Sequence, residues 1–181
     1  MTSVVRNTRE TQIQAIVDGT DSASSVDTTI PFLDHMLQTL ARYSGLHLEL
    51  RARGDLRHHI SEDVAITVGE ALAAWAPESR ARYGDRTVPM DDALVHVSLD
   101  LGGRAYYEGP LPSGTYDHWM RSFAGHAGAT LHVRVLRGRD RHHVVEAAFK
   151  ALGLALRDAL ATSNGRTVFS TKGSVELRVD R

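Results

Sequence analysis

A motif of two adjacent histidines followed three residues later by a glutamate, HHxxE, occurs twice, at residues 58–62 and 142–146. On a helix, residues three and four apart lie on one face, so each glutamate can stand beside its histidines. Two imidazoles and a carboxylate suit a borderline metal such as Zn, Fe, Ni or Mn. Ordinary polar helix starts also contain His and Glu, but the repetition favours two clusters of metal ligands. The expected ligands are His58, His59, Glu62, His142, His143 and Glu146.

The composition is that of an ordinary globular protein, with 42% hydrophobic and 24% charged residues in a chain of 181. A net charge of −1 gives no reason to expect nucleic acid or an anionic membrane as a partner. The absence of cysteine excludes disulfides, thiolate ligands and cysteine nucleophiles, and it fits a cytoplasmic protein. No apolar run approaches the length of a membrane span, and the N-terminus lacks a signal-peptide pattern.

The hydrophobic pattern predicts the elements that carry these motifs. In the first half we expect a strand at residues 4–17, a loop at 19–29, a helix from Pro31 to Gly45, a strand at 46–51, a helix from the first HHxxE to about Trp75, and a loop at 81–90. In the second half we expect strands at 94–99 and 105–107, a helix at 117–127, a strand at 130–136 and a helix from the second HHxxE to about Ala161.

The halves correspond in more than the two motifs. Residues 33–36 (LDHM) correspond to residues 116–119 (YDHW), 83 positions later. Residues 46–48 (LHL) correspond to residues 131–133 (LHV), 85 positions later. Strands in runs and helices in pairs favour helices packed on one face of each sheet. We therefore expect an α+β fold with an internally duplicated α/β unit and two mixed sheets, each covered by helices. Residues 1–91 would form the first repeat and 92–181 the second, within one compact domain.

The remaining histidines leave alternatives open. His35 lies on an apolar helix beside Asp34, so it is either a ligand with an orienting neighbour or a hydrogen-bonded structural histidine. His132 lies in an alternating strand whose buried face the pattern does not fix. The others are expected to be structural or on the surface: His47, His96, His118 and His126.

A second kind of site is indicated near the C-terminus. Ser170, Thr171 and Lys172 directly precede Gly173, and their hydroxyl, ammonium and backbone N–H groups could bind phosphate. An ordinary solvated tail has the same composition. Arg82 and Arg104, both near glycines, are further phosphate ligands or surface charges.

Taken together, these motifs resemble the imidazoleglycerol-phosphate dehydratases over nearly the whole chain. The matching pieces follow one another in the order found in that family: 9–11 (RET), 31–37 (PFLDHML), 54–56 (GDL), 58–59 (HH), 62–63 (ED), 82–84 (RYG), 89–91 (PMD), 100–101 (DL), 103–104 (GR), 131–132 (LH), 142–143 (HH), 146–147 (EA), 149–150 (FK) and 170–173 (STKG).

The resemblance implies an architecture and an assembly. The fold would consist of repeats like ribosomal protein S5 domain 2, built into a 24-subunit homo-oligomer of trimers. The active sites would lie between subunits, each with two Mn²⁺ ions. The implied ligands are His35, His58, His59, Glu62, His132, His142, His143 and Glu146, and His118 is left out of this set.

The resemblance also implies a reaction, the loss of water from imidazole glycerol phosphate to give imidazole acetol phosphate in histidine biosynthesis. Glu10 would be the acid/base catalyst, and Lys150 a further catalytic residue. The implied phosphate ligands are Arg82, Arg104, Ser170 and Lys172. The alternatives are a dinuclear metal hydrolase acting on a phosphorylated small molecule and a paralogous metal-binding shell without activity.

One stretch departs from the family pattern. The loop before the first histidine pair is about three residues shorter than usual, and Arg57 stands where the family has an aspartate. Ile60 also replaces the threonine that usually follows the pair. The shortened loop sets the geometry of the first histidine pair.

Overall fold

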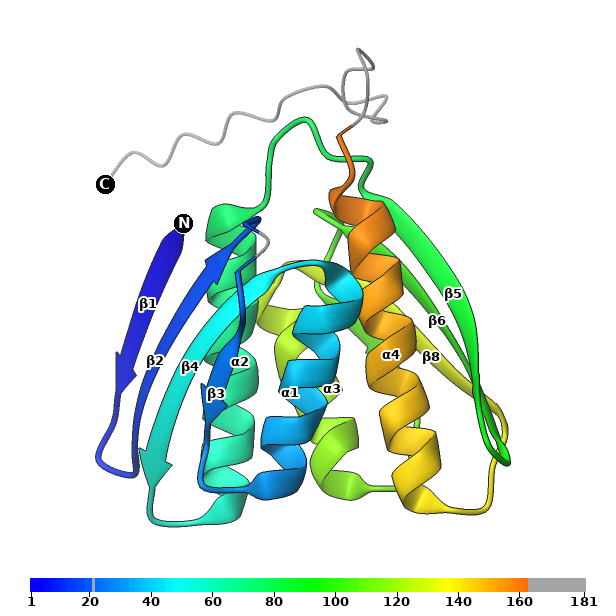
Figure 1. The fold of residues 1–181 in the computed structure, drawn as a ribbon, viewed down its shortest axis with the longest axis horizontal. Helices are drawn as coiled ribbons and strands as arrows, with labels where there is room; N and C mark the ends of the chain where they lie inside the picture. Colours follow the sequence, from blue (N-terminus) through cyan, green and yellow to red (C-terminus); the bar gives the residue numbers. More distant parts are fainter. Residues whose placement is uncertain (21, 163–181) are drawn as a thin grey trace, which may run out of the picture.

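The computed structural model describes residues 1–20 and 22–162, which form two sheets with the helices packed between them (Figure 1). The first sheet has the order β1-β2-β4-β3 and the second β5-β6-β8-β7. The strands are β1 (Thr2–Asn7), β2 (Thr11–Asp18), β3 (Ser25–Asp27), β4 (His47–Gly54), β5 (Tyr83–Met90), β6 (Ala93–Leu101), β7 (Tyr106–Glu108) and β8 (Ala129–Arg137). The helices are α1 (Pro31–Ser44), α2 (Arg57–Trp75), α3 (Gly114–His126) and α4 (Arg141–Leu160).

The two halves have the same topology. Each runs strand, strand, strand, helix, strand, helix, and in each the third strand is parallel to the fourth while the other pairs are antiparallel. The duplicated α+β fold with two mixed sheets is therefore confirmed. The division into residues 1–91 and 92–181 stays a prediction. Because β5 pairs with β6 in the second sheet, we propose an earlier boundary, within residues 76–82.

Most of the expected helices and strands are present, and three expectations were wrong. The strand expected at residues 4–17 is a hairpin, β1 and β2, because polar residues 8–10 form a turn. The loop expected at 81–90 contains β5, in which Gly84 and Val88 are buried and too widely spaced to give an apolar pattern. The loop expected at 19–29 contains the short strand β3.

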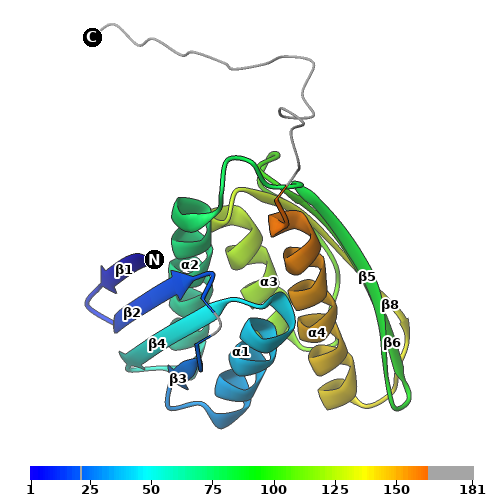
Figure 2. The same cartoon turned by 45° about the horizontal axis from the view of Figure 1, so that its top comes forward.

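The helices begin at one end of the molecule, the lower end in Figure 1, and pack in pairs, α1 with α4 and α2 with α3 (Figure 2). In each helix pair, a glycine lies where the two helix backbones come closest together. A Cβ on Gly153 would lie 3.0 Å from the Leu40 carbonyl oxygen in α1, and one on Gly69 would lie 2.9 Å from the Phe123 carbonyl oxygen in α3. These glycines therefore set the helix separation that determines the distances between side chains on paired helices.

Aromatic side chains fill the core beneath the helix starts. Trp119, Phe123 and Phe149 are fully buried, and the Trp119 ring stacks on Phe123 at 5.2 Å and lies 4.8 Å from Phe149. Burying each contributes about 2–3 kcal/mol. None of the described helices is both long and apolar enough to cross a membrane.

Candidate metal centre

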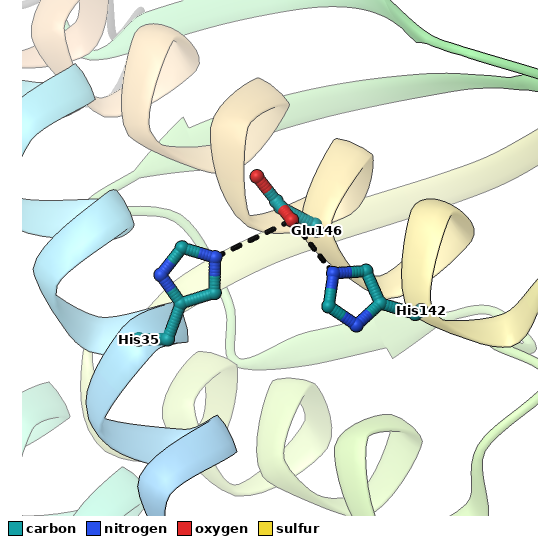
Figure 3. A group of neighbouring side chains, drawn as sticks. All are labelled: His35, His142 and Glu146. Atoms are coloured by element: carbon teal, nitrogen blue, oxygen red, sulfur yellow. Dashed lines mark hydrogen bonds and ion pairs between the residues drawn. The ribbon is translucent and has the colours of Figure 1, made fainter.

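The first cluster of potential metal ligands joins α1 to α4 (Figure 3). One ligand atom each from His35, His142 and Glu146 lie within 4.8 Å of one another. Glu146 Oε2 is 3.1 Å from His142 Nε2 and 3.4 Å from His35 Nε2, so both imidazoles face one carboxylate oxygen. The structure therefore brings His35 into the site as the family resemblance implies.

Lys150 forms an ion pair with the other carboxylate oxygen of Glu146, with its Nζ 2.9 Å from Oε1. Burial of Glu146 opposes its ionised form, but the hydrogen bond and charge of Lys150, together with His35, lower its pKa overall. Glu146 is thus held ionised with one oxygen directed at the two imidazoles. Lys150 therefore lies at this cluster, and its catalytic role stays a prediction.

The second cluster joins α2 to α3 and contains His58, Glu62 and His118. Glu62 Oε2 is 3.7 Å from His58 Nε2, and its Oε1 is 3.6 Å from His118 Nε2. The sequence left His118 out of the expected ligand set, and the structure places it beside Glu62 in this group of potential ligands. The offset of 83 that relates residues 33–36 to 116–119 was the signal, because it makes His118 the counterpart of His35.

The second histidine of each motif joins neither cluster. His59 Nδ1 lies 2.8 Å from Asp55 Oδ1, and His143 Nδ1 lies 2.7 Å from Asp92 Oδ1. These hydrogen bonds raise the pKa of both histidines. A histidine that donates Nδ1–H to a carboxylate presents Nε2 as its ligand atom. The i,i+4 pairs of each motif are therefore formed, but the expected i,i+3 pairs are not.

The hairpin turn between β5 and β6 supplies the partner of His143. Asp92 accepts hydrogen bonds from His143 and from the backbone N–H groups of Arg139 and Asp140, which lowers its pKa to about 2. The neighbouring Asp91 has a φ of 47° and places its carboxylate 3.5 Å from His143 Nε2. Sequence reasoning missed both aspartates, since turn residues carry no periodic pattern.

Asp34 and Asp117 directly precede His35 in α1 and His118 in α3. Their carboxylates accept hydrogen bonds from the segments before each helix and not from the imidazoles. Asp34 Oδ1 accepts from Thr28 N at 2.8 Å, and Asp117 Oδ1 accepts from Leu111 N at 2.9 Å and Tyr107 Oη at 2.6 Å. Each aspartate thus ties the start of its helix to the segment before it. Asp34 is therefore not the orienting partner of the His35 ring.

The other candidate residues lie apart from the two clusters. The His132 ring, on β8, is 5.7 Å from the Tyr106 ring, and no three-ligand group found in the described part of the chain includes it. Glu10 lies in the β1–β2 turn with Oε2 3.7 Å from His59 Nδ1. Arg104 is exposed. Ser170 and Lys172 lie outside the described residues.

Arg82 is held by Asp100. Its Nε donates to Oδ1 at 2.6 Å and its Nη2 to Oδ2 at 2.9 Å, and this bidentate pair raises the pKa of the guanidinium. Its backbone has a φ of 76°, at the connection that leads into β5. The Arg82 side chain is therefore held in one orientation and stays positively charged.

The fold and the clusters define a class: a duplicated α+β protein that carries two matched sets of two imidazoles and a carboxylate at the starts of paired helices. Residues 28–156 match the family model described as imidazoleglycerol-phosphate dehydratase. The chain belongs to this family.

Two relatives and a solved structure are similar to nearly the whole of this chain. The imidazoleglycerol-phosphate dehydratase of Desulforudis audaxviator is 45% identical, with 95% of this chain and 96% of that protein covered. A chloroplastic relative from Arabidopsis thaliana is 43% identical, with 94% of this chain and 70% of that protein covered. A crystal structure of the Pyrococcus furiosus enzyme, in complex with the compound (S)-C348, superposes with a TM-score of 0.85 at 39% identity and covers 95% of this chain and all of that one.

Proposed function

We propose that the protein is a hydro-lyase that converts imidazole glycerol phosphate into imidazole acetol phosphate, a step of histidine biosynthesis. Family membership over nearly the full length supports this activity. The observation that carries it is the pair of matched clusters, His35–His142–Glu146 and His58–Glu62–His118. Two such clusters related by the internal repeat suit a reaction in which one small imidazole substrate is held and polarised from two sides.

The donor set of both clusters fits Mn²⁺, which we propose as the cofactor, two ions per active site. Each cluster offers two imidazole nitrogens and one carboxylate, which leaves coordination positions open for substrate and further ligands. When bound, such ions act as Lewis acids and as a template for the substrate. Because His132 lies against Tyr106, we propose His118 in its place, with His59 and His143 completing the ligand set.

We propose Glu10 as the base that takes the carbon-bound proton of the substrate. Its carboxylate is about half exposed and lies near His59, so it reaches the edge of the site without being bound into a cluster. A positioned carboxylate accelerates such a proton transfer by about 10²–10⁴-fold. Arg82 and Arg104 would bind the phosphate group together with Ser170 and Lys172, and Lys150, beside Glu146, would be a further catalytic residue.

A homo-oligomer is part of this proposal, as a 24-mer of trimers in the cytoplasm. The support is that His59 and His143 stay outside both clusters of their own chain, each with Nδ1 bonded to a carboxylate. A neighbouring copy can use their Nε2 atoms to complete its coordination. Shared sites of this kind fit closed, symmetric assemblies.

The test is turnover of imidazole glycerol phosphate by the Mn²⁺-loaded protein, followed by detection of the ketone product. Formation of imidazole acetol phosphate at a rate that depends on Mn²⁺ is the expected result. No turnover at full metal occupancy would refute the proposal in favour of a metal-binding shell. Release of inorganic phosphate without the ketone would identify a phosphate-ester hydrolase instead.

A further inference from the structure

Asp63, the residue after Glu62, is a buried carboxylate that belongs to neither metal cluster. It accepts hydrogen bonds from two strands of the first sheet. Arg6 Nε, from β1, donates to Oδ1 at 3.0 Å, and Thr11 Oγ1, at the start of β2, donates to Oδ2 at 2.5 Å. Helix α2 is thereby tied to both strands of the hairpin whose turn carries Glu10.

The hydroxyl groups of the turn form a chain with a defined direction. An ionised Asp63 can only accept, so Thr11 Oγ1 must donate its single hydrogen to it. Thr8 Oγ1, 3.1 Å from Thr11 Oγ1, must then donate to Thr11. Its lone pairs accept the backbone N–H of Glu10 at 3.1 Å and of Thr11 at 2.9 Å. The carboxylate of Asp63 thus orients the hydroxyl that binds the Glu10 backbone.

The other side of Glu10 is held by the connection between β4 and α2. The Glu10 carbonyl oxygen accepts from Asp55 N at 3.1 Å. A Cβ on Gly54 would come within 2.9 Å of the same oxygen, so only glycine allows this close approach. Asp55 also binds His59, so the turn with Glu10 and the ring of His59 rest on one short connection.

The second half builds the same hairpin without this network. Ala147, the counterpart of Asp63 after Glu146, is buried and has no polar side chain. There the acid of the turn itself anchors the hairpin, because Asp92 binds Arg139 N, Asp140 N and His143. In the first half the anchor lies behind the turn. The carboxylate of the turn residue, Glu10, is not part of this anchor and stays exposed.

We infer that Asp63, acting through Thr11 and Thr8, is a positioning residue that holds Glu10 where it can exchange a proton with the substrate. The inference rests on the proposed base role of Glu10. The Asp63 network couples α2, which carries His58 and Glu62, to the turn that carries Glu10. The distance between the proposed metal ligands and the proposed base is thereby fixed.

The test compares Thr11→Val, which keeps the side-chain shape and removes the hydroxyl, with Thr11→Ser, which keeps the hydroxyl. For Thr11→Val we expect about a 10-fold lower kcat with KM and Mn²⁺ content unchanged, because a small misplacement of a reacting group is costly. Thr11→Ser should retain most of the activity. Arg6→Gln removes the other partner of Asp63, and it should lower the unfolding temperature while kcat stays within about twofold.

Two further measurements separate positioning from support. In the double variant Glu10→Gln/Thr11→Val, kcat should fall no further than in Glu10→Gln alone, because the hydroxyl then has no base to position. Hydrogen exchange of the Glu10 amide in metal-free protein should be faster in Thr11→Val than in Arg6→Gln.

The contrary results are equally specific. Equal losses of stability in Thr11→Val and Arg6→Gln with unchanged kcat would mean that the network only supports the structure. Additive losses of kcat in the double variant Glu10→Gln/Thr11→Val would mean that Thr11 does not act through Glu10. A wild-type protein without turnover would overturn the base role itself, whereas the exchange measurement would still show whether the network holds the turn.

Discussion

At the scale of single residues, the internal repeat indicates which histidines lie together in space. His35 and His118 occupy the same position in α1 and α3, and each faces the glutamate of the partner helix. Likeness to the family pattern favoured His132, whose ring contacts Tyr106 instead. Neither His35 nor His118 has a helical partner in its own sequence segment, so only the spatial pairing of helices joins each to its cluster.

We therefore predict that His118→Ala and His132→Ala differ in metal content. His118→Ala should bind Mn²⁺ more weakly by about 10–100-fold at one of the two clusters, so that the dialysed protein retains about half the metal. His132→Ala should retain all of it. Metal analysis of the purified variants is the measurement, and the reverse pattern would restore His132 to the ligand set.

The carboxylate partners of His59 and His143 predict opposite pH dependences for folding and metal binding. A raised pKa means that the folded, metal-free chain binds these protons more tightly than the unfolded chain, whose value is near 6.5. Their contribution to stability is present below that value and is lost as the pH rises through the raised pKa. Metal ligands must be neutral, so Mn²⁺ affinity should rise over the same pH range.

Unfolding temperatures of metal-free protein and Mn²⁺ titrations between about pH 6 and 9 test this prediction. Asp55→Asn and Asp92→Asn remove the negative charges beside the two imidazoles and should flatten both dependences. Metal-free stability that increases with pH over this range would contradict it.

At the scale of elements, the sequence predicts those helices and strands that have a strong hydrophobic period or clear terminal residues. α1 begins at Pro31 and ends before Gly45, which has a φ of 75°, as expected from a proline in the first turn and a left-handed cap. β5 lacked any such signal, since only Gly84 and Val88 are buried in it. In the site, the i,i+4 spacing gave each His–Glu pair. The adjacent histidine points about 100° away around the helix, and its partner could not be predicted from spacing.

The close helix pairs predict the effect of a single methyl group. In Gly153→Ala the new Cβ would lie 2.7 Å from Tyr43 Cβ, 3.0 Å from the Leu40 oxygen and 3.1 Å from Ser44 N. Alanine gains about 1 kcal/mol of helix propensity, but backbone atoms cannot rotate away, and overpacking costs about 1–3 kcal/mol. Movement of α1 away from α4 also carries His35 away from Glu146.

We therefore expect a net loss of about 1–2 kcal/mol in the free energy of unfolding, together with weaker Mn²⁺ binding at the first cluster. Urea denaturation and metal titration measure the two effects. Gly125→Ala in α3 is the matched control, since a Cβ there meets nothing within 4 Å. It should stabilise the protein by up to about 1 kcal/mol. Equal effects of the two substitutions would show that close helix packing at Gly153 is unimportant.

At the scale of the whole molecule, duplication places equivalent ligands at the starts of all four described helices, which lie at one end of the fold (Figure 1). Each cluster draws on two helices, one from each half: α1 with α4, and α2 with α3. Neither half can form a cluster alone, so each cluster depends on the packing of one half against the other. His59 and His143 lie outside both clusters, each bonded to a carboxylate.

If active sites are completed between subunits, two inactive variants should complement each other. Glu62→Gln damages the second cluster and Glu146→Gln the first, so each variant alone should lose activity. In mixed assemblies, a site that takes its first cluster from one chain and its second from another has about a one-in-four chance of finding both intact. Activity near one quarter of wild type after co-expression, measured against each variant alone, would support shared sites. Mixtures without regained activity would mean that both clusters of a site belong to one chain, since every chain then carries one defect.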